Sequence, residues 1–329
     1  MKRFLAGLSA VALGLSLLAG CASDTADRAS AGTAEQTSYP RTVEVPGDPP
    51  QQVTLPTRPV RIAALSADVA EAAVELVGAE RLTAVPVSAT NPSLSSHAEQ
   101  MATVPTKLPP GNDPDPEQII ALNPDLILIT ARHGGERDAQ AVLAPAGIPM
   151  IAITTGWGTL EEVKQNLTLL GRALDAEAKA RELTAELDRR ADAVAEQAGG
   201  TTDRPSVAIL SNQAGRPFIN AADVLTSDLV RRAGGALVAD RIGLRSTGPV
   251  SAEQLIAAEP DAILLIDVTG KGRDSFRSLL DNPAVAGLAA VREGRVKLLP
   301  ARTSYGIGGV RLADGLEEIA RWLHPETFP

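Results

Sequence analysis

The chain has 329 residues, of which 44% are hydrophobic and only 2% aromatic, with 31 basic and 40 acidic side chains and a single cysteine. This length suits two lobes of ordinary domain size better than one core, and a mean hydropathy of +0.02 with 22% charged residues excludes long disorder and a multi-span membrane protein. One cysteine excludes a disulfide framework, and the acidic balance argues against nucleic acid as a partner, because phosphate neutralisation needs clustered Lys and Arg.

The N-terminus has the pattern of a secretory signal. Lys2 and Arg3 precede an apolar stretch over 4–18, and Leu-Ala-Gly-Cys closes the segment at Cys21. This motif resembles the lipobox of bacterial lipoproteins, which implies lipid attachment to the Cys21 thiol and cleavage before it; an ordinary signal with an incidental cysteine is the alternative. We therefore predict a signal peptide over 1–21 and a lipid-anchored protein outside the cytoplasm, in the periplasm or at the cell surface.

The next segment, residues 22–57, is rich in Ala, Ser, Thr, Asp and Pro and shows almost no apolar periodicity. Such a composition predicts a flexible tether. The folded part is expected to begin after it, at about residue 58.

Two stretches far apart in the chain share one order of elements. An apolar run over 60–66 precedes a helical pattern over 68–77, which ends at Gly78. Residues 206–211 form a similar run, followed by a helical stretch over 224–233 and by two glycines. Each half is therefore predicted to open with a strand and a helix.

A sharper internal repeat lies inside each half. Residues 115–130 have the sequence DPEQIIALNPDLILIT and residues 251–266 have SAEQLIAAEPDAILLI, which agree at eight of sixteen positions. Asp115 and Ser251 are the expected N-caps of two short helices, and a Pro-Asp pair then starts a buried strand. Helix, tight turn and apolar strand form the back half of a βαβ unit, so we predict an α/β fold with two Rossmann-like lobes and mainly parallel sheets.

Between the lobes, residues 159–197 contain no proline and one glycine, Gly171. Leucines and valines recur at spacings of three and four, and Thr159 with Glu162 forms a capping-box pattern. The pattern predicts one long backbone helix over 158–198 that holds the lobes apart. Two ordinary helices joined near Gly171 are the alternative.

These features together resemble the substrate-binding lipoproteins of ABC importers for iron-siderophores, haem and cobalamin. The resemblance rests on the lipobox, the long connecting helix and the repeat EQ-(I/L)-I-A-x-x-PD-x-I-L in both halves, and it covers residues 58–324. It implies an N-terminal lobe over 58–157, the backbone helix over 158–198, a C-terminal lobe over 199–329, and a monomer that delivers a small ligand to a permease and its ATPase. In this family a surface glutamate at the start of each repeated helix docks on permease arginines, which implies that role for Glu117 and Glu253; favourable first-turn acids are the structural alternative.

Loops that follow the strands of both lobes are expected to line one ligand cleft. Basic loop residues in an acidic protein suit an anionic or oxygen-rich metal chelate. Partly by resemblance, the candidate ligand residues are Lys107, Arg132, His133, Trp157, Asn212, Arg216, Phe218, Arg245, Arg302 and Tyr305.

We predict a ferric siderophore as the ligand, because a siderophore supplies its own oxygen donors and the protein then needs no metal ligand or resident cofactor. Few aromatic residues disfavour cobalamin. Haem stays as an alternative, with His97, His133 or Tyr305 as a possible axial ligand. Bare zinc or manganese is disfavoured, because the chain has only three histidines.

An enzyme is the alternative of a different class. The chain lacks Gly-x-Ser-x-Gly, a Walker-type loop, Gly-x-Gly-x-x-Gly after a strand and His-Glu-x-x-His. We therefore predict a binding protein and no catalytic residue.

Overall fold

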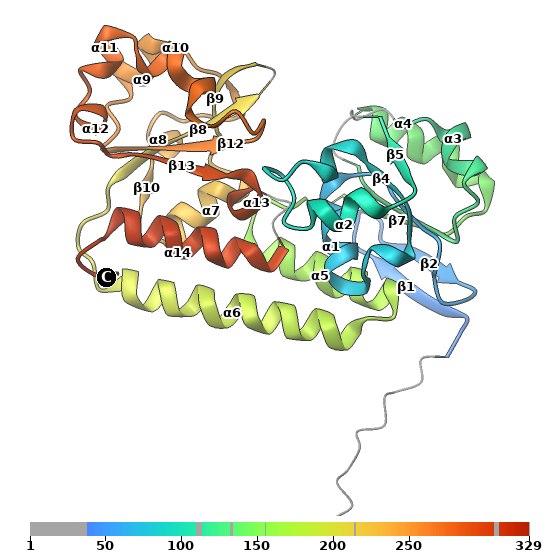
Figure 1. The fold of residues 1–329 in the computed structure, drawn as a ribbon. Coiled ribbons are helices and arrows are strands. Elements are labelled where there is room, and N and C mark those ends of the chain that lie inside the picture. The colour runs from blue at the N-terminus through green and yellow to red at the C-terminus, as the bar shows by residue number, and fades with distance from the viewer. Residues whose placement is uncertain are drawn as a thin grey trace, which may run out of the picture. The chain divides into compact units, whose positions relative to one another are not determined.

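Two sheets of mainly parallel strands, each covered by helices, form the framework of the protein, as predicted (Figure 1). The structure is a computed structural model that describes residues 38–109, 114–131, 134–154, 156–213, 215–305 and 309–328. Residues 38–329 belong to one unit. The predicted signal peptide, Cys21 and the first part of the predicted tether lie outside the described residues.

The N-terminal sheet is entirely parallel, in the order β5-β4-β3-β6-β7. Every residue of the interior strand β6 is buried, because helices cover both faces of such a sheet. Its strands are β3 (Ile62–Ala64), β4 (Leu82–Pro86), β5 (Thr106–Leu108), β6 (Leu126–Thr130) and β7 (Met150–Ile153). The helices between them are α1 (Ala67–Val77), α2 (Ala98–Thr103), α3 (Pro116–Ala121) and α4 (Gly134–Leu143), with 3-10 turns η1 (Ala79–Arg81), η2 (Val87–Thr90) and η3 (Ala144–Ala146).

The C-terminal sheet is mixed. Its parallel strands are β8 (Ser206–Gln213), β10 (Ala236–Leu237), β12 (Ala262–Asp267) and β13 (Val296–Pro300), and an antiparallel edge consists of β9 (Arg216–Ile219) and β11 (Gly248–Pro249). The helices are α7 (Leu225–Arg232), α8 (Val238–Arg241), α9 (Ala252–Ala257), α10 (Arg277–Leu280), α11 (Pro283–Ala286), α12 (Ala289–Arg292), α13 (Ala301–Ser304) and α14 (Leu312–Leu323), with 3-10 turns η4 (Gly272–Phe276) and η5 (Gly309–Arg311).

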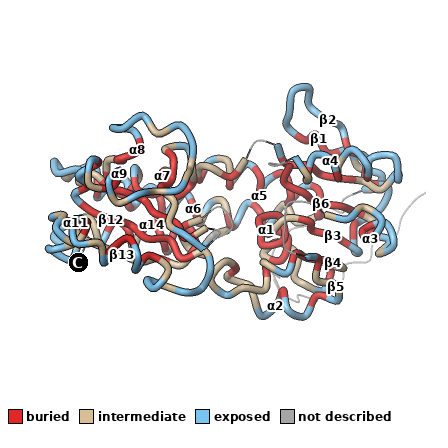
Figure 2. The backbone as a smooth tube through the Cα atoms, turned by 90° about the horizontal axis from the view of Figure 1, so that it is seen from above, coloured by how far each residue is buried: buried red, intermediate tan, exposed pale blue. Residues whose placement is uncertain are grey.

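Both copies of the repeat have the predicted structure. Asp115 caps α3 by accepting from the backbone N–H of Glu117, and Ser251 caps α9 in a capping box with Gln254. The strands β6 and β12 that follow lie inside their sheets, each between two parallel neighbours. Figure 2 shows the inner strands β3, β6 and β12 and helix α1 as largely buried.

The connecting segment is helical, but it is two helices rather than one rod from 158 to 198. Helix α5 (Leu160–Leu174) ends at Asp175, which has a left-handed backbone with φ 58°, and α6 (Glu177–Gly199) then begins. Gly171 lies so close to Ala180 that a Cβ at this glycine would be 2.5 Å from the Ala180 Cβ. The two helices therefore pack antiparallel. The prediction of one unbroken helix is wrong, and the alternative of two helices joined near Gly171 agrees better with the structure. An aspartate in the left-handed region ends α5 where no glycine or proline marked a break.

Helix α6 is the long backbone helix of the fold. Its 23 residues span about 35 Å at 1.5 Å per residue. Near its start, Leu183 lines a hollow shared with Val74 of α1, and further along Arg190 binds Asp314 and Glu317 of α14 at 2.7 Å each. The helix thus packs on both lobes (Figure 1).

The predicted tether 22–57 is wrong for its last part. Strands β1 (Arg41–Val45) and β2 (Gln51–Leu55) form an antiparallel hairpin, and its alternate residues Val43, Val45, Val53 and Leu55 are buried in the main core cluster. The period-2 alternation of these apolar side chains is the signal that the polar composition obscured. Arg41 attaches the hairpin to α5 and α6: it donates to the carbonyl of Arg172 at 2.6 Å and forms an ion pair with Glu177 at 2.5 Å.

Candidate functional site: the meeting point of the lobes

The site lies where loops after the carboxyl ends of strands from both lobes touch. Arg302 follows β13, and its backbone N–H donates to the Ser93 carbonyl at 2.9 Å, in the loop after β4. The Arg302 side chain donates from Nη1 to the Pro92 carbonyl at 2.8 Å. Carboxyl ends of parallel strands are the usual ligand-binding edge of open α/β sheets.

Beside this contact lies an open hollow of about 410 Å³. The N-terminal lobe supplies most of its lining and the C-terminal lobe supplies Arg302, which makes it a candidate cleft between the lobes. The residues that line this inter-lobe hollow are Pro92, Ser95, Ser96, His97, Ala98, Glu99, Gln100 and Arg302.

A buried carboxylate shapes the N-terminal side of the hollow. Glu71 on α1 is only 1% exposed and accepts hydrogen bonds from Ser95 Oγ at 2.5 Å and from the backbone N–H of Ser96 at 2.8 Å. Its Oε1 also lies 3.0 Å from His97 Nδ1. Three groups of one turn therefore converge on a single carboxylate, which fixes the turn against α1.

Sequence reasoning missed this cluster. The Asn-Pro pair at 91–92 and the serines that follow are turn signals, but Glu71 resembles any polar residue in the helical pattern over 68–77. His97 entered only as a possible haem ligand. The signal that the sequence offered is an acidic residue, Glu71, within an otherwise small and apolar run from Val69 to Ala73.

The other strand ends of the N-terminal lobe carry a closed polar network. Trp157 Nε1 donates to Thr130 Oγ1 at 3.1 Å, which in turn donates to Asp68 Oδ1 at 2.8 Å. Trp157 is only 6% exposed and belongs to the core cluster. The structure therefore does not support the predicted role of Trp157 as a ligand contact, because its indole packs in the core and binds Thr130 instead of being exposed for stacking.

The equivalent strand ends of the C-terminal lobe form a second network around Asp267. Burial opposes ionisation of Asp267, but hydrogen bonds from Asn212 Nδ2 and from the backbone N–H groups of Gly272, Gly270 and Thr269 hold its pKa below the usual value. Asn212 is 1% exposed and bonds Asp267 at 2.9 Å. Its predicted role as a ligand contact gives way to a structural one.

The remaining predicted ligand residues divide by exposure. Lys107 on the edge strand β5 donates from Nζ to the carbonyls of Ala102 and Val104, so its ammonium serves the end of α2. Arg216 lies over the Phe218 ring, 5.5 Å from its centroid, and Arg245 is exposed.

Tyr305 is half-buried against the core, and Arg132 and His133 lie outside the described residues. Among the predicted ligand residues that the structure describes, Arg302 alone lines the inter-lobe hollow.

The two predicted docking residues are both accessible. Glu117 on α3 and Glu253 on α9 are exposed first-turn residues of short helices. The backbone N–H of Glu253 and the Ser251 side chain lower the pKa of the Glu253 carboxyl, so it is charged at neutral pH. Figure 1 shows α3 and α9 on the side of the protein away from α6.

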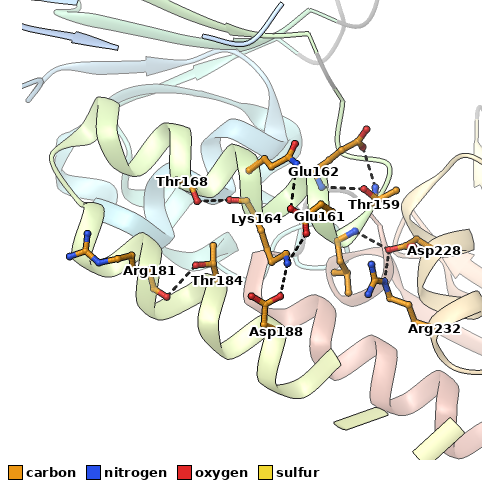
Figure 3. A network of polar contacts seen from close by, with 12 residues as sticks. Thr159, Glu161, Glu162, Lys164, Thr168, Arg181, Thr184, Asp188, Asp228 and Arg232 are labelled. Atoms are coloured by element: carbon orange, nitrogen blue, oxygen red, sulfur yellow. Dashed lines mark hydrogen bonds and ion pairs between the residues drawn. The ribbon is translucent and has the colours of Figure 1, made fainter. Parts of the chain in front are cut away.

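The helices between the lobes are tied to their surroundings by charges (Figure 3). Lys164 of α5 pairs with Asp188 of α6 at 2.5 Å. The backbone N–H of Leu160, at the start of α5, donates to Asp228 of α7 at 2.9 Å, and Asp228 also pairs with Arg232. These contacts join α5, α6 and the C-terminal lobe, and they favour modest lobe movement over free hinge bending.

Within the described ranges, no group of three or more His, Cys, Asp or Glu side chains is placed to hold a metal ion. Among the helices in this part of the chain, none has the length and apolar character that crossing a membrane requires.

Two Rossmann-like lobes that meet at their strand ends, over a long shared helix, define the class III architecture of bilobal binding proteins. The chain belongs to the periplasmic binding protein family, whose family model matches residues 62–303. It is 22% identical over 334 residues to the uncharacterized ABC transporter substrate-binding lipoprotein YvrC of Bacillus subtilis, covering 100% of this chain and 99% of YvrC.

Two further relatives bind iron compounds, according to their names. The ferric-anguibactin-binding protein FatB of Vibrio anguillarum is 27% identical over 199 residues, which cover 58% of this chain and 61% of FatB. The periplasmic heme-binding protein RhuT from Roseiflexus sp. RS-1, in its apo form, superposes with a TM-score of 0.69 at 25% identity, covering 81% of this chain and 98% of RhuT.

These relationships confirm the predicted family and class. The relatives are substrate-binding transport proteins rather than enzymes, and they bind small ligands outside the cytoplasm for an ABC permease and its ATPase. The α/β fold with two lobes and a long backbone helix is confirmed as well.

Proposed function

We propose that this protein captures a ferric siderophore between its lobes and delivers it to an ABC permease. The observation that carries the proposal is the family match over residues 62–303, together with the similarity to FatB. The inter-lobe hollow with Arg302 supports it, because a guanidinium suits an anionic, oxygen-rich chelate.

Other basic and aromatic residues predicted from the sequence complete the proposed ligand surface. They are Arg216, Phe218, Arg245 and Tyr305, with Arg132 and His133 from the segment after β6. No resident metal or cofactor is proposed, since the iron arrives inside its chelate.

The proposed assembly is a monomer anchored by lipid on Cys21. The loaded protein docks through Glu117 and Glu253, one from each lobe, on arginines of the permease. Support for docking is the exposure of both carboxylates on helices that face away from α6. Support for the anchor is the Leu-Ala-Gly-Cys motif, and YvrC is itself named a lipoprotein.

Isothermal titration of the protein without its signal peptide tests the ligand. The panel is a ferric trihydroxamate, a ferric catecholate, ferric citrate, haem and cobalamin. We expect one ferric chelate class to bind with a Kd of about 1 μM or lower, the range in which about 8 kcal/mol of binding free energy is gained. Titration heats that are flat with every ferric chelate would reject the proposal.

Haem is the second candidate, and the similarity to RhuT favours it. The same panel separates the two, because haem binding would produce a shifted Soret band that ferric siderophores lack. Mass spectrometry of the membrane-extracted protein tests the anchor: the diacylglyceryl mass on Cys21 is expected, and an unmodified N-terminal peptide would contradict it.

A further inference from the structure

We propose that the inter-lobe hollow is a subsite for an anionic oxygen group of the ligand, such as a carboxylate, held between Arg302 of one lobe and His97 of the other. Glu71 is the positioning residue of this subsite. The inference deepens the proposed function, since it takes the hollow to be part of the ligand site.

Arg302 supplies the charge on the C-terminal side. Its guanidinium donates to a neutral carbonyl, that of Pro92, and no described carboxylate lies within ion-pair distance of it. A guanidinium has five N–H donors, so most of them remain available beside the hollow. An arginine that is held in place by a carbonyl but lacks a counter-charge is prepared for an anion.

His97 supplies the donor on the N-terminal side. Its Nδ1 faces Glu71 Oε1 at 3.0 Å, and no described group bonds its Nε2. A carboxylate on one ring nitrogen fixes the ring orientation and leaves the other nitrogen to act toward a ligand. Ser95 and Ser96 also bind Glu71, so the carboxylate that orients the imidazole is itself held in place.

Ser96, which lines the hollow, has a buried hydroxyl without a partner in the described structure. Glu99 also lines the hollow. Its carboxylate repels an anionic ligand whose negative charge lies away from Arg302.

The charges that face His97 favour its protonated form. The hydrogen bond to Glu71 raises the pKa of His97, burial opposes this, and the negative charges of Glu71 and Glu75 add to the rise. Arg311 of η5 lowers the pKa. On the side of α6, the charged residues lining the neighbouring hollow of about 510 Å³ are Lys179, Glu182 and Glu186. The imidazole therefore keeps its charge to a higher pH than a free histidine does.

Proton NMR of the histidine Cε1–H resonances tests the subsite with metal-free citrate as the probe. The chain has three histidines, so a His97→Gln variant assigns the signal. We expect citrate to shift the His97 resonance saturably and to raise its titration midpoint, because an anion stabilises the imidazolium. Arg302→Gln should weaken citrate about tenfold, whereas Arg292→Gln, an exposed arginine outside the hollow, should leave the affinity unchanged.

Glu71→Gln distinguishes positioning from simple stability. It should lower the His97 titration midpoint and weaken citrate, and a loss of thermal stability alone would mean that Glu71 only braces the turn. A His97 resonance that citrate never moves, or an affinity untouched by Arg302→Gln, overturns the inference.

The proposed function has its own outcome in the same experiment. Citrate that binds at His97 while every ferric chelate fails to bind would uphold the subsite and reject the siderophore. Ferric chelates that bind equally to wild type, His97→Gln and Arg302→Gln would uphold the function and reject the subsite.

Discussion

The two copies of the internal repeat, α3–β6 and α9–β12, bind the neighbouring strand of their sheet through an equivalent aspartate but with partly different partners. In the first copy, Asp125 accepts from the backbone N–H groups of Val60 and Arg61 at 2.8 and 2.9 Å. In the second, Asp261 accepts from the backbone N–H and the hydroxyl of Ser206 at 2.8 and 2.7 Å. Each aspartate thus ties the start of the neighbouring strand, β3 or β8, to the repeat.

The helix ends show the same equivalence. Arg61 donates to the carbonyls of Leu122 and Asn123, and Arg241 donates to those of Ala258 and Glu259. The two arginines come from unrelated places in their lobes. The Pro-Asp part of the repeat therefore contacts a neighbouring strand in both lobes. In the Glu-Gln part, Gln254 completes the capping box of α9, but the exposed Glu117 and Glu253 make no described ion pair or hydrogen bond with another helix or strand. That contrast supports the proposal that the shared glutamates serve docking rather than folding.

Removal of both glutamates is the largest test of this equivalence. Glu117→Ala with Glu253→Ala should abolish iron uptake and leave ligand affinity unchanged, because the charged hydrogen bonds to the permease, about 1.5–3 kcal/mol each, are lost together. Each single variant should reduce uptake roughly tenfold or more. Radioactive iron uptake and isothermal titration measure the two quantities, with Glu196→Ala on α6 as the exposed control. A double variant that transports normally, or one that loses ligand affinity, would contradict the docking role.

The repeat also explains how much the sequence could predict. Its period, its helix caps and its apolar strands are local signals, and α1, α3, α9, β6 and β12 all appear where those signals placed them. The turn at Asp175 and the hairpin of residues 41–55 were not predicted. A left-handed aspartate and a five-residue apolar alternation are weak sequence signals when the surrounding residues are polar.

The site was harder to predict for a physical reason. Whether a loop side chain is exposed depends on partners that are distant in the sequence. Trp157 donates to Thr130 and is buried, and Asn212 donates to Asp267, which is 55 residues away in the chain. Arg302 was predicted as a ligand residue and lines the inter-lobe hollow. Its side-chain contact with Pro92 spans 210 residues, beyond the reach of any local pattern.

Loss of the tying aspartates should destabilise both lobes, the first more than the second. Asp125→Ala removes two charged hydrogen bonds at a half-buried position and should cost about 2 kcal/mol, and Asp261→Ala, more exposed, about 1 kcal/mol. Each kcal/mol corresponds to a fall in Tm of roughly 2–4 °C. Differential scanning calorimetry against Asp203→Ala, an exposed aspartate, measures this. Equal Tm values for all three variants would show that the aspartates do not hold the strands.

The residue before each Pro-Asp pair offers a finer test, since both adopt a left-handed backbone, Asn123 with φ 48° and Glu259 with φ 40°. Asparagine tolerates this region and glutamate does not. Glu259→Asn should therefore stabilise the protein by about 0.5–1 kcal/mol, and Asn123→Ala should destabilise it by about 1 kcal/mol. Urea midpoints measure both. Opposite signs would mean that side-chain contacts, not backbone strain, decide these positions.

The smallest expected effect is the acid dependence of the second copy. Hydrogen bonds from the Ser206 side chain and backbone lower the pKa of Asp261 below its usual value, burial opposes the shift, and the charges of Arg295 and Arg241 add to it. A lowered folded-state pKa gives stability that is fully present above the unfolded value and is lost as the pH falls through the folded value. The urea midpoint of wild type should therefore fall more steeply than that of Asp261→Asn between pH 5 and pH 3, while Asp203→Asn follows wild type. Parallel curves for wild type and Asp261→Asn would show that the Asp261–Ser206 contact is screened by solvent, in which case the two copies of the repeat differ in strength as well as in chemistry.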